Sequence, residues 1–142
     1  ALGDIDHFKS INDNFGHIQG DRVLRQVGDI LSSSMRGVFD IAGRYGGEEF
    51  LLIFDETDAQ KTHQIVERLR NTIAQTAFEQ VDQTGKVVKG KSLAITISFG
   101  IAALDQKEGR FTVTDWISRA DRALYHAKEN GRNRTTLFNK DL

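Results

Sequence analysis

The sequence predicts an α+β domain, on three observations. Two apolar runs flank Gly46-Gly47, which is typical of antiparallel strands joined by a tight turn. Apolar residues alternate with small or polar ones from Leu93 to Ile101, as in a strand with one face in the core. Amphipathic helical patterns lie before, between and after these strands. The length of 142 residues suits a single domain, 1–142, with its own core.

The composition narrows the classes of function. A net charge of -1 argues against a non-specific nucleic-acid binder, so any anion site must be built locally. The absence of cysteine excludes disulfides, thiolate metal sites and a cysteine nucleophile, and is compatible with the cytoplasmic location that we expect. No apolar run approaches the length needed to cross a membrane, so we expect no membrane contact from this stretch of chain.

The chain opens with an expected strand, Ala1 to Asp6. Within it Asp4 and Asp6 share one face, while Ile5 points the other way, into the core. Two aspartates in this pattern can bind a metal ion, although the pattern alone more often has a structural role. A buried strand normally has more residues before its acidic end, so we expect that an upstream segment has been removed.

A segment rich in Asn, Asp and Gly follows the strand. Apolar residues at helical spacing predict a short helix closed by Gly16 or Gly20. Asp21 then caps a second helix that runs to Met35. Local capping explains Asn12 and Asp21. Alternatively, this amide and this carboxylate together address the acceptor and the N–H donors on the edge of guanine.

The hairpin around Gly46-Gly47 is expected to pair Phe39–Arg44 with Glu49–Phe54. Both glycines can take positive φ without strain, and their lack of side chains lets a ligand approach the backbone. Glu48 and Glu49 follow directly, although no turn requires two adjacent like charges. These carboxylates are either solvated surface acids or a site for a divalent cation and a general base.

The remaining elements follow from periodicity and capping signals. Thr112 and Asp115 form a capping-box pattern, and Gly131 suits the position just after a helix. In chain order we expect a helix from Thr57 or Asp58 to about Phe78, a polar surface hairpin or loop over Val81–Lys91, a helix from Thr112 to about Asn130, and a last short strand over Thr135–Phe138.

Cationic side chains stand at two places. Lys128 and Arg132 are spaced i, i+4 at the C-terminal end of the last helix, where the helix dipole favours each cation by roughly 0.3–1 kcal/mol. Alternatively, the pair is a clamp for a polyphosphate tail. Lys9 is a further phosphate candidate, and the backbone N–H groups of His7, Phe8 and Lys9 can cradle phosphates if the turn leaves them free.

The sequence combines three kinds of candidate site: carboxylates for a metal ion, cations for phosphates, and an amide–carboxylate pair for a purine base. Their joint occurrence indicates an enzyme that acts on a nucleoside triphosphate. Three ordered blocks carry them. They are Asp4-Ile5-Asp6-His7-Phe8-Lys9-Ser10-Ile11-Asn12-Asp13 with Phe15-Gly16-His17 and Gly20-Asp21, then Arg44-Tyr45-Gly46-Gly47-Glu48-Glu49-Phe50, then Ala120-Asp121-Arg122-Ala123-Leu124-Tyr125-His126-Ala127-Lys128 with Gly131-Arg132-Asn133. These blocks resemble the GGDEF-domain diguanylate cyclases, in a GGEEF variant, and the match extends to about Arg134.

The resemblance implies a domain related to the nucleotide-cyclase palm, with a central, mostly antiparallel five-stranded sheet flanked by helices. It implies a diguanylate cyclase that condenses two GTP into cyclic di-GMP and releases two pyrophosphates. Each domain would bind one GTP, and a second copy would face it so that each 3′-hydroxyl attacks the other α-phosphate. The alternative is a catalytically silent module that binds GTP or cyclic di-GMP. A cyclase that makes a cyclic mononucleotide fits the blocks less well.

The resemblance also assigns catalytic roles. Mg²⁺ or Mn²⁺ would be held by the side chains of Asp4 and Glu48 and by the carbonyl of Ile5. Glu48 or Glu49 would assist deprotonation of the 3′-hydroxyl, and we favour Glu48. Lys9 would offset the charge that develops on the phosphoryl group.

A second group of residues is expected to bind the substrate. Asn12 and Asp21 would read guanine, with His17 nearby, although a lone histidine is more often structural. Lys128 and Arg132 would grip the β- and γ-phosphates. The full set implied by the resemblance is Phe8, Asn12, His17, Asp21, Gly46, Gly47, Lys128 and Arg132.

The chain departs from the family in two respects. Many members carry an inhibitory product site, Arg-x-x-Asp, shortly before the Gly-Gly turn. Asp40 is in place here, but Gly37 stands three residues earlier and Arg36 is one position off. We therefore expect weak or absent product inhibition at Arg36 and Asp40, unless a one-residue bulge restores Arg36. The helical segment that normally precedes the acidic strand is missing, so we expect a sensor or dimerisation region upstream in a parent chain.

Overall fold

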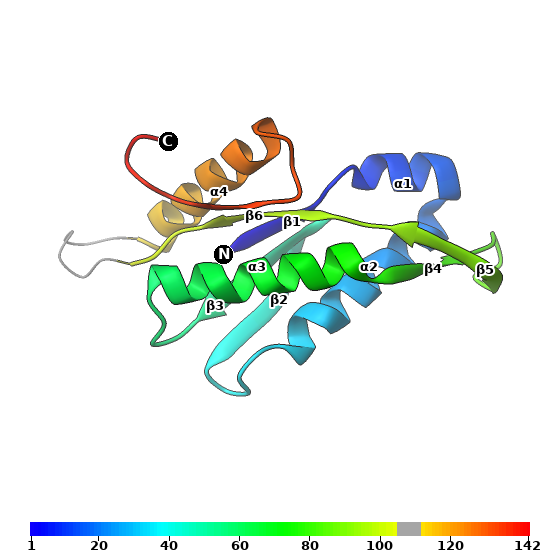
Figure 1. Ribbon diagram of the computed structural model, residues 1–142, viewed down its shortest axis with the longest axis horizontal. Coiled ribbons are helices and arrows are strands. Elements are labelled where there is room, and N and C mark those ends of the chain that lie inside the picture. The colour runs from blue at the N-terminus through cyan, green and yellow to red at the C-terminus, as the bar shows by residue number, and fades with distance from the viewer. Residues whose placement is uncertain (105–111) are drawn as a thin grey trace.

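The computed structural model describes residues 1–104 and 112–142, and its centre is a five-stranded sheet (Figure 1). All pairs of neighbouring strands in this sheet are antiparallel except the last, β6 with β7. The expectation of a mostly antiparallel five-stranded sheet is therefore confirmed. In spatial order the strands are β2 (Asp40–Gly46), β3 (Glu49–Phe54), β1 (Leu2–Ile5), β6 (Ile97–Ile101) and β7 (Thr135–Leu137).

Helices cover both faces of this sheet, as Figure 1 shows, with α4 on one side and α2 and α3 on the other. α1 extends from the end of β1 and packs on α2. The helices are α1 (Phe8–Phe15), α2 (His17–Ser33), α3 (Ala59–Gln75) and α4 (Val113–Glu129). The sequence also forms a separate two-stranded sheet from β4 (Ala77–Val81) and β5 (Val87–Ala94).

The central strands are buried on both faces. All five residues of β6 are buried, including Ser98. The expectation that this strand has only one face in the core is therefore wrong. α4 packs directly on its second face at Gly100, where a Cβ atom would lie 2.0 Å from the Ala120 carbonyl oxygen. Glycine is required there because two pieces of backbone are in contact.

The start of α2 differs from the expectation. Gly16, at a φ of 86°, separates α1 from α2, and α2 begins at His17 rather than after Asp21. Asp21 therefore lies inside the helix, where its exposed carboxylate is not used as a cap. α3 begins as expected, because the side chain of Asp58 accepts a hydrogen bond from the Lys61 N–H at 2.8 Å.

The helix expected to reach Phe78 ends at Gln75 instead, and β4 begins at Ala77. β4 pairs with β5, so the polar stretch is a hairpin, and Leu93 belongs to β5 rather than to β6. Fully buried Gln19 ties this hairpin to α2. Its amide donates to the Glu79 carbonyl at 3.1 Å and accepts from the Val81 N–H at 2.7 Å.

The turn of the β2–β3 hairpin lies one residue later than expected. Gly46 pairs with Glu49, so the two turn residues are Gly47 and Glu48, and of the two glycines Gly47 takes a positive φ, 51°. At α4 the capping box between Thr112 and Asp115 is confirmed.

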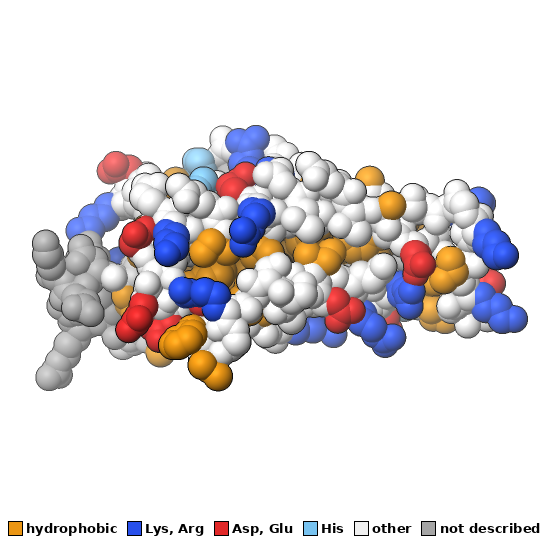
Figure 2. Space-filling model, turned by 60° about the horizontal axis from the view of Figure 1, so that its bottom comes forward, with side chains coloured by type: hydrophobic (Ala, Val, Ile, Leu, Met, Phe, Trp, Pro, Cys, Tyr) orange, Lys and Arg blue, Asp and Glu red, His pale blue; other side chains and the backbone are white. Residues whose placement is uncertain are grey.

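Charges are interspersed on the face shown in Figure 2, where basic and acidic side chains alternate around a band of hydrophobic ones. Exposed apolar side chains include Val38, Phe39 and Ile41, around the start of the edge strand β2. In residues 1–104 and 112–142, none of the helices combines the length and the apolar character that a membrane span requires.

Candidate functional site

Carboxylates from two neighbouring strands gather at one end of the sheet. The pairing of β1 with β3 places Asp4 opposite Glu49, so the two side chains share a face. The Ile5 N–H donates to the Glu48 carbonyl at 3.3 Å, which joins the hairpin turn to the end of β1. The structure therefore brings together the two acids of the turn and the first acid of the chain.

Lys128 reaches this cluster from α4. Its Nζ lies 2.8 Å from Asp4 Oδ2, and both side chains are largely covered. Burial raises the pKa of Asp4, and the hydrogen bond and positive charge of Lys128 oppose that rise without cancelling it. Asp4 is therefore a largely buried carboxylate whose negative charge is partly balanced by Lys128.

Glu49 is the second acid with a perturbed pKa. Burial raises the pKa of Glu49, and the negative charges of Asp4, Asp121 and Glu48 raise it further, while Lys128 lowers it. Glu49 is therefore influenced by the negative charges of three other carboxylates and by one ammonium group. A positive charge placed among them would relieve this repulsion.

The cluster is chemically suited to a hard divalent cation. In the part of the chain that the structure describes, no three Asp, Glu or His side chains form a metal-binding group. The expected donor set has only two such side chains, Asp4 and Glu48, and takes its third oxygen from the Ile5 carbonyl. Carboxylate and carbonyl oxygens are the ligands that Mg²⁺ prefers, and the excess of negative charge agrees with such an ion.

The N-terminus of α1 lies immediately beyond β1. His7 precedes it in the left-handed region, at a φ of 56°, and no side chain caps the helix. The first N–H groups of the helix, at Phe8 and Lys9, have no partner within the helix. The Phe8 side chain is buried and the Lys9 side chain is exposed, so the first turn of α1 offers backbone donors and a solvent-exposed ammonium group just after β1.

Asn12 on α1 lies against α2 at Gly20, where the two helices pack closely. A Cβ atom at Gly20 would lie 1.9 Å from Asn12 Oδ1, so only glycine lets the carboxamide lie against α2 at this point. Asp21 is the next residue along the chain. His17 is exposed at the start of the same helix.

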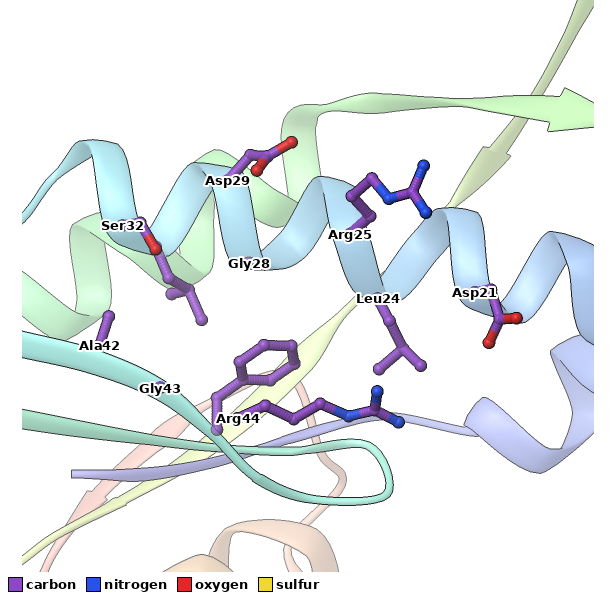
Figure 3. A pocket seen from close by; sticks show the side chains of 11 residues that line it. Asp21, Leu24, Arg25, Gly28, Asp29, Ser32, Ala42, Gly43 and Arg44 are labelled. Atoms are coloured by element: carbon purple, nitrogen blue, oxygen red, sulfur yellow. The ribbon is translucent and has the colours of Figure 1, made fainter.

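A groove of about 590 Å³ lies between α2 and the β2–β3 hairpin. Figure 3 shows Asp21 and the guanidinium group of Arg44 toward one end of this groove, with Ser32 and Ala42 at the other. Arg44 donates from Nε to the Gly47 carbonyl at 2.8 Å. The same side chain therefore lines the groove and holds the turn that carries Glu48.

The site thus combines clustered acids, a lysine, a helix N-terminus without a side-chain cap and a polar groove. A model of the family described as "Diguanylate cyclase, GGDEF domain" matches residues 1–134. The chain belongs to the GGDEF diguanylate cyclase family.

Curated relatives of this GGDEF domain include proteins named as diguanylate cyclases. It is 40% identical over 141 residues to Diguanylate cyclase A of Treponema denticola, covering 98% of this chain and 34% of the relative. It is 42% identical over 134 residues to Diguanylate cyclase DgcP of Pseudomonas aeruginosa, covering 94% of this chain and 18% of the relative. The chain therefore spans about a third or less of the length of these relatives.

Solved structures give the same fold. The active GGEEF domain of a diguanylate cyclase from Vibrio cholerae matches with a TM-score of 0.81 and 32% identity, over 98% of this chain and 81% of that one. The GGDEF domain of DgcB from Caulobacter crescentus, in complex with c-di-GMP, matches with a TM-score of 0.82 and 34% identity, over 96% of this chain and 74% of that one. Both likenesses support the α+β architecture of this GGDEF domain.

Arg132 lies outside α4, contrary to the expectation that it shares a helix with Lys128. α4 ends at Glu129, and Arg132 adopts a left-handed conformation with a φ of 60°. Its side chain nevertheless stays near the helix end, because Nη1 lies 3.4 Å from the Lys128 carbonyl oxygen. The two cations are therefore neighbours, but on a helix and on the loop that follows it.

Arg36 and Asp40 of the GGDEF domain bind each other. Arg36 donates from Nε and Nη2 to the two carboxylate oxygens of Asp40, at 2.8 and 2.7 Å. The same Nη2 also donates to the Asp55 carbonyl and the Thr57 hydroxyl. Asp40 is buried, and the hydrogen bonds from Arg36 hold its pKa below the usual value. This pair fastens the base of the β2–β3 hairpin.

Sequence reasoning missed the roles of two groups at this site and left open, for a third, Asp6, the choice between metal binding and a structural role. Arg44 was read only as part of a motif, although it holds the turn. Asp121 was not singled out, although its charge acts on Glu49. Asp6 accepts hydrogen bonds from Thr96, Ser98 and Asn133, so the second acid of the opening pair is an internal fastener. Its partners lie far along the chain, and no local pattern reveals them.

Proposed function

We propose that this domain is an active diguanylate cyclase that condenses two GTP into cyclic di-GMP and releases two pyrophosphates. The observation that carries the proposal is the gathering of Asp4, Glu48 and Glu49 beside Lys128, in a chain matched to the family over residues 1–134. A polar groove that contains Asp21 opens on the other side of the same hairpin. The proposed catalytic acids and the proposed guanine pocket thus lie on either side of one hairpin turn.

The reaction consists of two equivalent displacements. The 3′-oxygen of one GTP attacks the α-phosphorus of the other, and the bond to the bridging oxygen breaks so that pyrophosphate leaves. The proton of the 3′-hydroxyl passes to a carboxylate, for which we favour Glu48 over Glu49. Two domains that face each other hold one GTP each, so the second displacement closes the ring. A second copy of the domain is therefore the required partner.

A divalent metal ion is the expected cofactor, as GGDEF diguanylate cyclases generally use one. Asp4, Glu48 and the Ile5 carbonyl would hold Mg²⁺ or Mn²⁺. When bound, such an ion withdraws charge from the phosphate oxygens. Lys9 and the free N–H groups at the start of α1 would add to this stabilisation from the protein itself.

Recognition of GTP is assigned to two sets of residues. Asn12 and Asp21 address the guanine edge, with His17 at the mouth of the same inter-helix contact. Lys128 and Arg132 grip the β- and γ-phosphates. Support for this division comes from the contact between Asn12 and Gly20 and from the nearness of Arg132 to the end of α4. Gly46 and Gly47 leave room beside the acids, since a Cβ built at either would meet no heavy atom of the described residues within 4 Å, apart from those of its chain neighbours.

The simplest test is to incubate the protein with GTP and Mg²⁺ and to separate the nucleotides by chromatography. The cyclase predicts cyclic di-GMP and pyrophosphate in a ratio of one to two, at a rate that rises with the square of protein concentration when the domains associate weakly. Binding of GTP without turnover would instead support the silent regulatory module.

Replacement of Gly20 by alanine is expected to weaken GTP binding roughly tenfold, because the added Cβ displaces the Asn12 carboxamide and leaves guanine donors unmatched. Titration with GTP and with ATP measures the effect. The preference for GTP over ATP should shrink in Gly20→Ala. Gly43→Ala is the control, since no heavy atom lies within 4 Å of a Cβ at Gly43. An unchanged preference in Gly20→Ala would contradict the assignment of Asn12.

Product inhibition through Arg36 and Asp40 is expected to be weak or absent. The sequence spacing differs from Arg-x-x-Asp, and the Arg36 guanidinium is already bonded to Asp40, Asp55 and Thr57. Titration of the protein with cyclic di-GMP during turnover tests this point. Tight inhibition that disappears in Arg36→Ala would show that the pair opens to bind product.

Arg36→Ala is instead expected to lower thermal stability in a pH-dependent way. The pKa of Asp40 is lowered in the folded protein, so its stabilising effect is complete above the unfolded pKa of about 4 and is lost as pH falls through the folded pKa. The unfolding midpoint of Arg36→Ala should lie several degrees below that of the unaltered protein at pH 7, and the gap should narrow toward pH 3. Lys89→Ala, at an exposed position, should leave the midpoint unchanged at both pH values.

A further inference from the structure

The segment that follows α4 is strained and carries Arg132. Gly131, Arg132 and Asn133 have φ angles of 104°, 60° and 44°, so two residues with a Cβ adopt the left-handed region in succession. Each of these two costs on the order of 1 kcal/mol or more, and such conformations persist only where surrounding contacts fix them. On the side of α4, the Arg132 N–H donates to the Ala127 carbonyl at 3.1 Å, and the Arg132 carbonyl accepts from Arg134 Nε at 3.3 Å. The contacts made by Asn133 hold the segment from the side of the sheet and α3.

The first of these contacts is with Asp6, at the end of β1. The Asn133 N–H donates to Asp6 Oδ2 at 3.0 Å. The carboxylate of Asp6, which is buried, also accepts from the hydroxyls of Thr96 and Ser98 at 2.8 and 2.7 Å. Three donors thus fix this carboxylate, and it ties the segment after α4 to the strand that carries Asp4.

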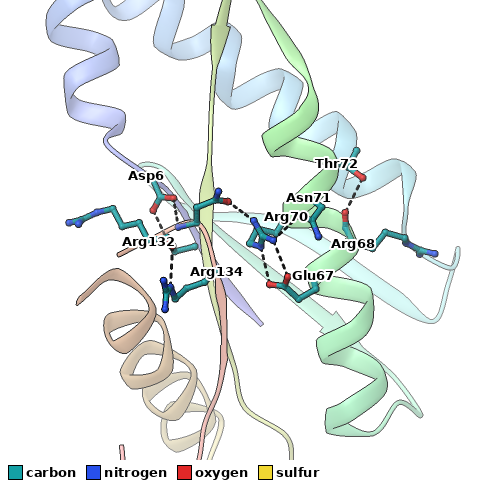
Figure 4. Close-up of polar contacts among 10 residues, drawn as sticks. Asp6, Glu67, Arg68, Arg70, Asn71, Thr72, Arg132 and Arg134 are labelled. Atoms are coloured by element: carbon teal, nitrogen blue, oxygen red, sulfur yellow. Dashed lines mark hydrogen bonds and ion pairs between the residues drawn. The ribbon is translucent and has the colours of Figure 1, made fainter. Parts of the chain in front are cut away.

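The second contact comes from Arg70 on α3, which covers the opposite face of the sheet from α4 (Figure 4). Arg70 Nη1 donates to Asn133 Oδ1 at 2.6 Å. The guanidinium also donates to both carboxylate oxygens of Glu67, at 2.9 and 3.0 Å, and to Asn71 Oδ1 at 2.7 Å.

This arrangement makes the Arg70 guanidinium a rigid support. Its side chain is only 12% exposed, and its two parallel hydrogen bonds to Glu67 fix the plane of the group. The hydrogen bonds from Arg70 hold the pKa of Glu67 below its usual value, so the pair is ionised at neutral pH. Asn133 therefore has one partner at the end of β1 and one on α3, and both partners are themselves fixed.

We infer that Arg70 is a positioning residue for the polyphosphate tail of the nucleotide, acting through Asn133 on the segment from which Arg132 reaches that tail. The inference rests on the proposed function, because it assumes that Arg132 binds phosphate. Arg70 itself does not touch the substrate. Without it, the Asn133 side chain loses its partner and the left-handed segment is held by its backbone contacts alone. Arg132 then occupies more positions, and binding must restrict it again.

The test is a double-mutant cycle on nucleotide affinity. The probe is a GTP analogue with a methylene group between the α- and β-phosphorus atoms, which keeps the tail but cannot release pyrophosphate. It is titrated, with Mg²⁺, into the unaltered protein, Arg70→Ala, Arg132→Ala and the double variant. We expect Arg132→Ala to weaken binding roughly ten- to hundredfold and Arg70→Ala roughly three- to tenfold. Because Arg70 acts through Arg132, the double variant should bind no more weakly than Arg132→Ala.

The outcomes separate the inference from the proposed function. Failure of the unaltered protein to bind the analogue overturns the proposed function and this inference with it. Normal binding in Arg70→Ala, or effects of the two substitutions that multiply, overturns the inference alone. Arg68→Ala is the matched control, because Arg68 lies two residues before Arg70 on α3, is exposed and points away from Arg70 (Figure 4). It should bind the analogue as the unaltered protein does.

A second variant removes the same contact without touching α3. Asn133→Gly keeps the backbone N–H for Asp6 and tolerates a positive φ, but lacks the oxygen that accepts from Arg70. We expect the same loss of affinity as in Arg70→Ala, and no further loss when the two are combined. A combined variant that binds much more weakly than either would show that Arg70 acts by a route other than Asn133. Thermal unfolding of each variant identifies any that fails to fold.

Discussion

Glu48→Gln is expected to reduce the synthesis of cyclic di-GMP by about a thousandfold. The substitution keeps the size of the side chain and removes the charge that, in the proposed function, accepts the 3′-proton and holds the metal ion. Glu48 is half-buried in the hairpin turn, and its carbonyl accepts from the Ile5 N–H, so the backbone geometry should survive. Initial rates of pyrophosphate release with GTP and Mg²⁺ measure the effect.

Two controls separate a loss of catalysis from a general effect of removing a charge or from a loss of GTP binding. Glu56→Gln removes the same charge just beyond the other end of β3 and should leave the rate unchanged, since Glu56 is exposed and distant from the turn. Binding of the methylene analogue of GTP should weaken far less than the rate falls, because Asn12, Asp21 and the phosphate grip remain. A Glu48→Gln protein that turns over at the unaltered rate would remove Glu48 from the catalytic set and leave Glu49 as the candidate base.

Gly100→Ala is expected to destabilise the fold by about 3 kcal/mol or more. The added Cβ would lie 2.0 Å from the Ala120 carbonyl oxygen and 2.2 Å from the Leu124 nitrogen. Both are backbone atoms of α4, so no side chain can move to relieve the contact. α4 must shift away from β6, and that shift also carries Lys128 away from Asp4. Chemical denaturation, compared with circular dichroism during heating, measures the loss of stability.

The matched control for this prediction is Gly43→Ala. A Cβ at Gly43 meets no heavy atom within 4 Å, and the residue lies in strand β2 at a negative or extended φ. Its stability should stay within about 0.5 kcal/mol of that of the unaltered protein. Equal stabilities for Gly100→Ala and Gly43→Ala would mean that α4 does not pack on β6 at the distance described.

Features that depend on local patterns were predictable from the sequence. The capping box of Thr112 and Asp115 predicted the start of α4. Alternating apolar residues predicted a strand ending at Ile101, but with one face in the core where both faces are buried. The same alternation runs through the break between β5 and β6, so the pattern could not show that Leu93 pairs with Phe78 in another sheet. Side-chain periodicity records burial, and both sheets bury the same kind of residue.

Other features depend on backbone conformation or on distant contacts, and the sequence could not reveal them. Asp21 was predicted to cap a helix that starts there. In the structure, Gly16 separates α1 from α2 five residues earlier, so Asp21 lies inside α2. The acids of the site were found because they stand in short motifs. The link from Asp6 through Asn133 to Arg70 joins segments that are far apart in the chain, and no spacing rule connects them.

The pairing of Asp4 with Glu49 has a consequence for how this domain can vary. Because side chains alternate along a strand, a single residue gained or lost between Phe50 and Phe54 would turn one of these acids to the opposite side, even if every apolar residue were kept. The distal turn at Asp82–Lys86 does not set the register between Asp4 and Glu49, since it joins the two strands of the separate sheet. Insertions and deletions should therefore accumulate at that far tip, while the segment that aligns the acids keeps a constant count of residues.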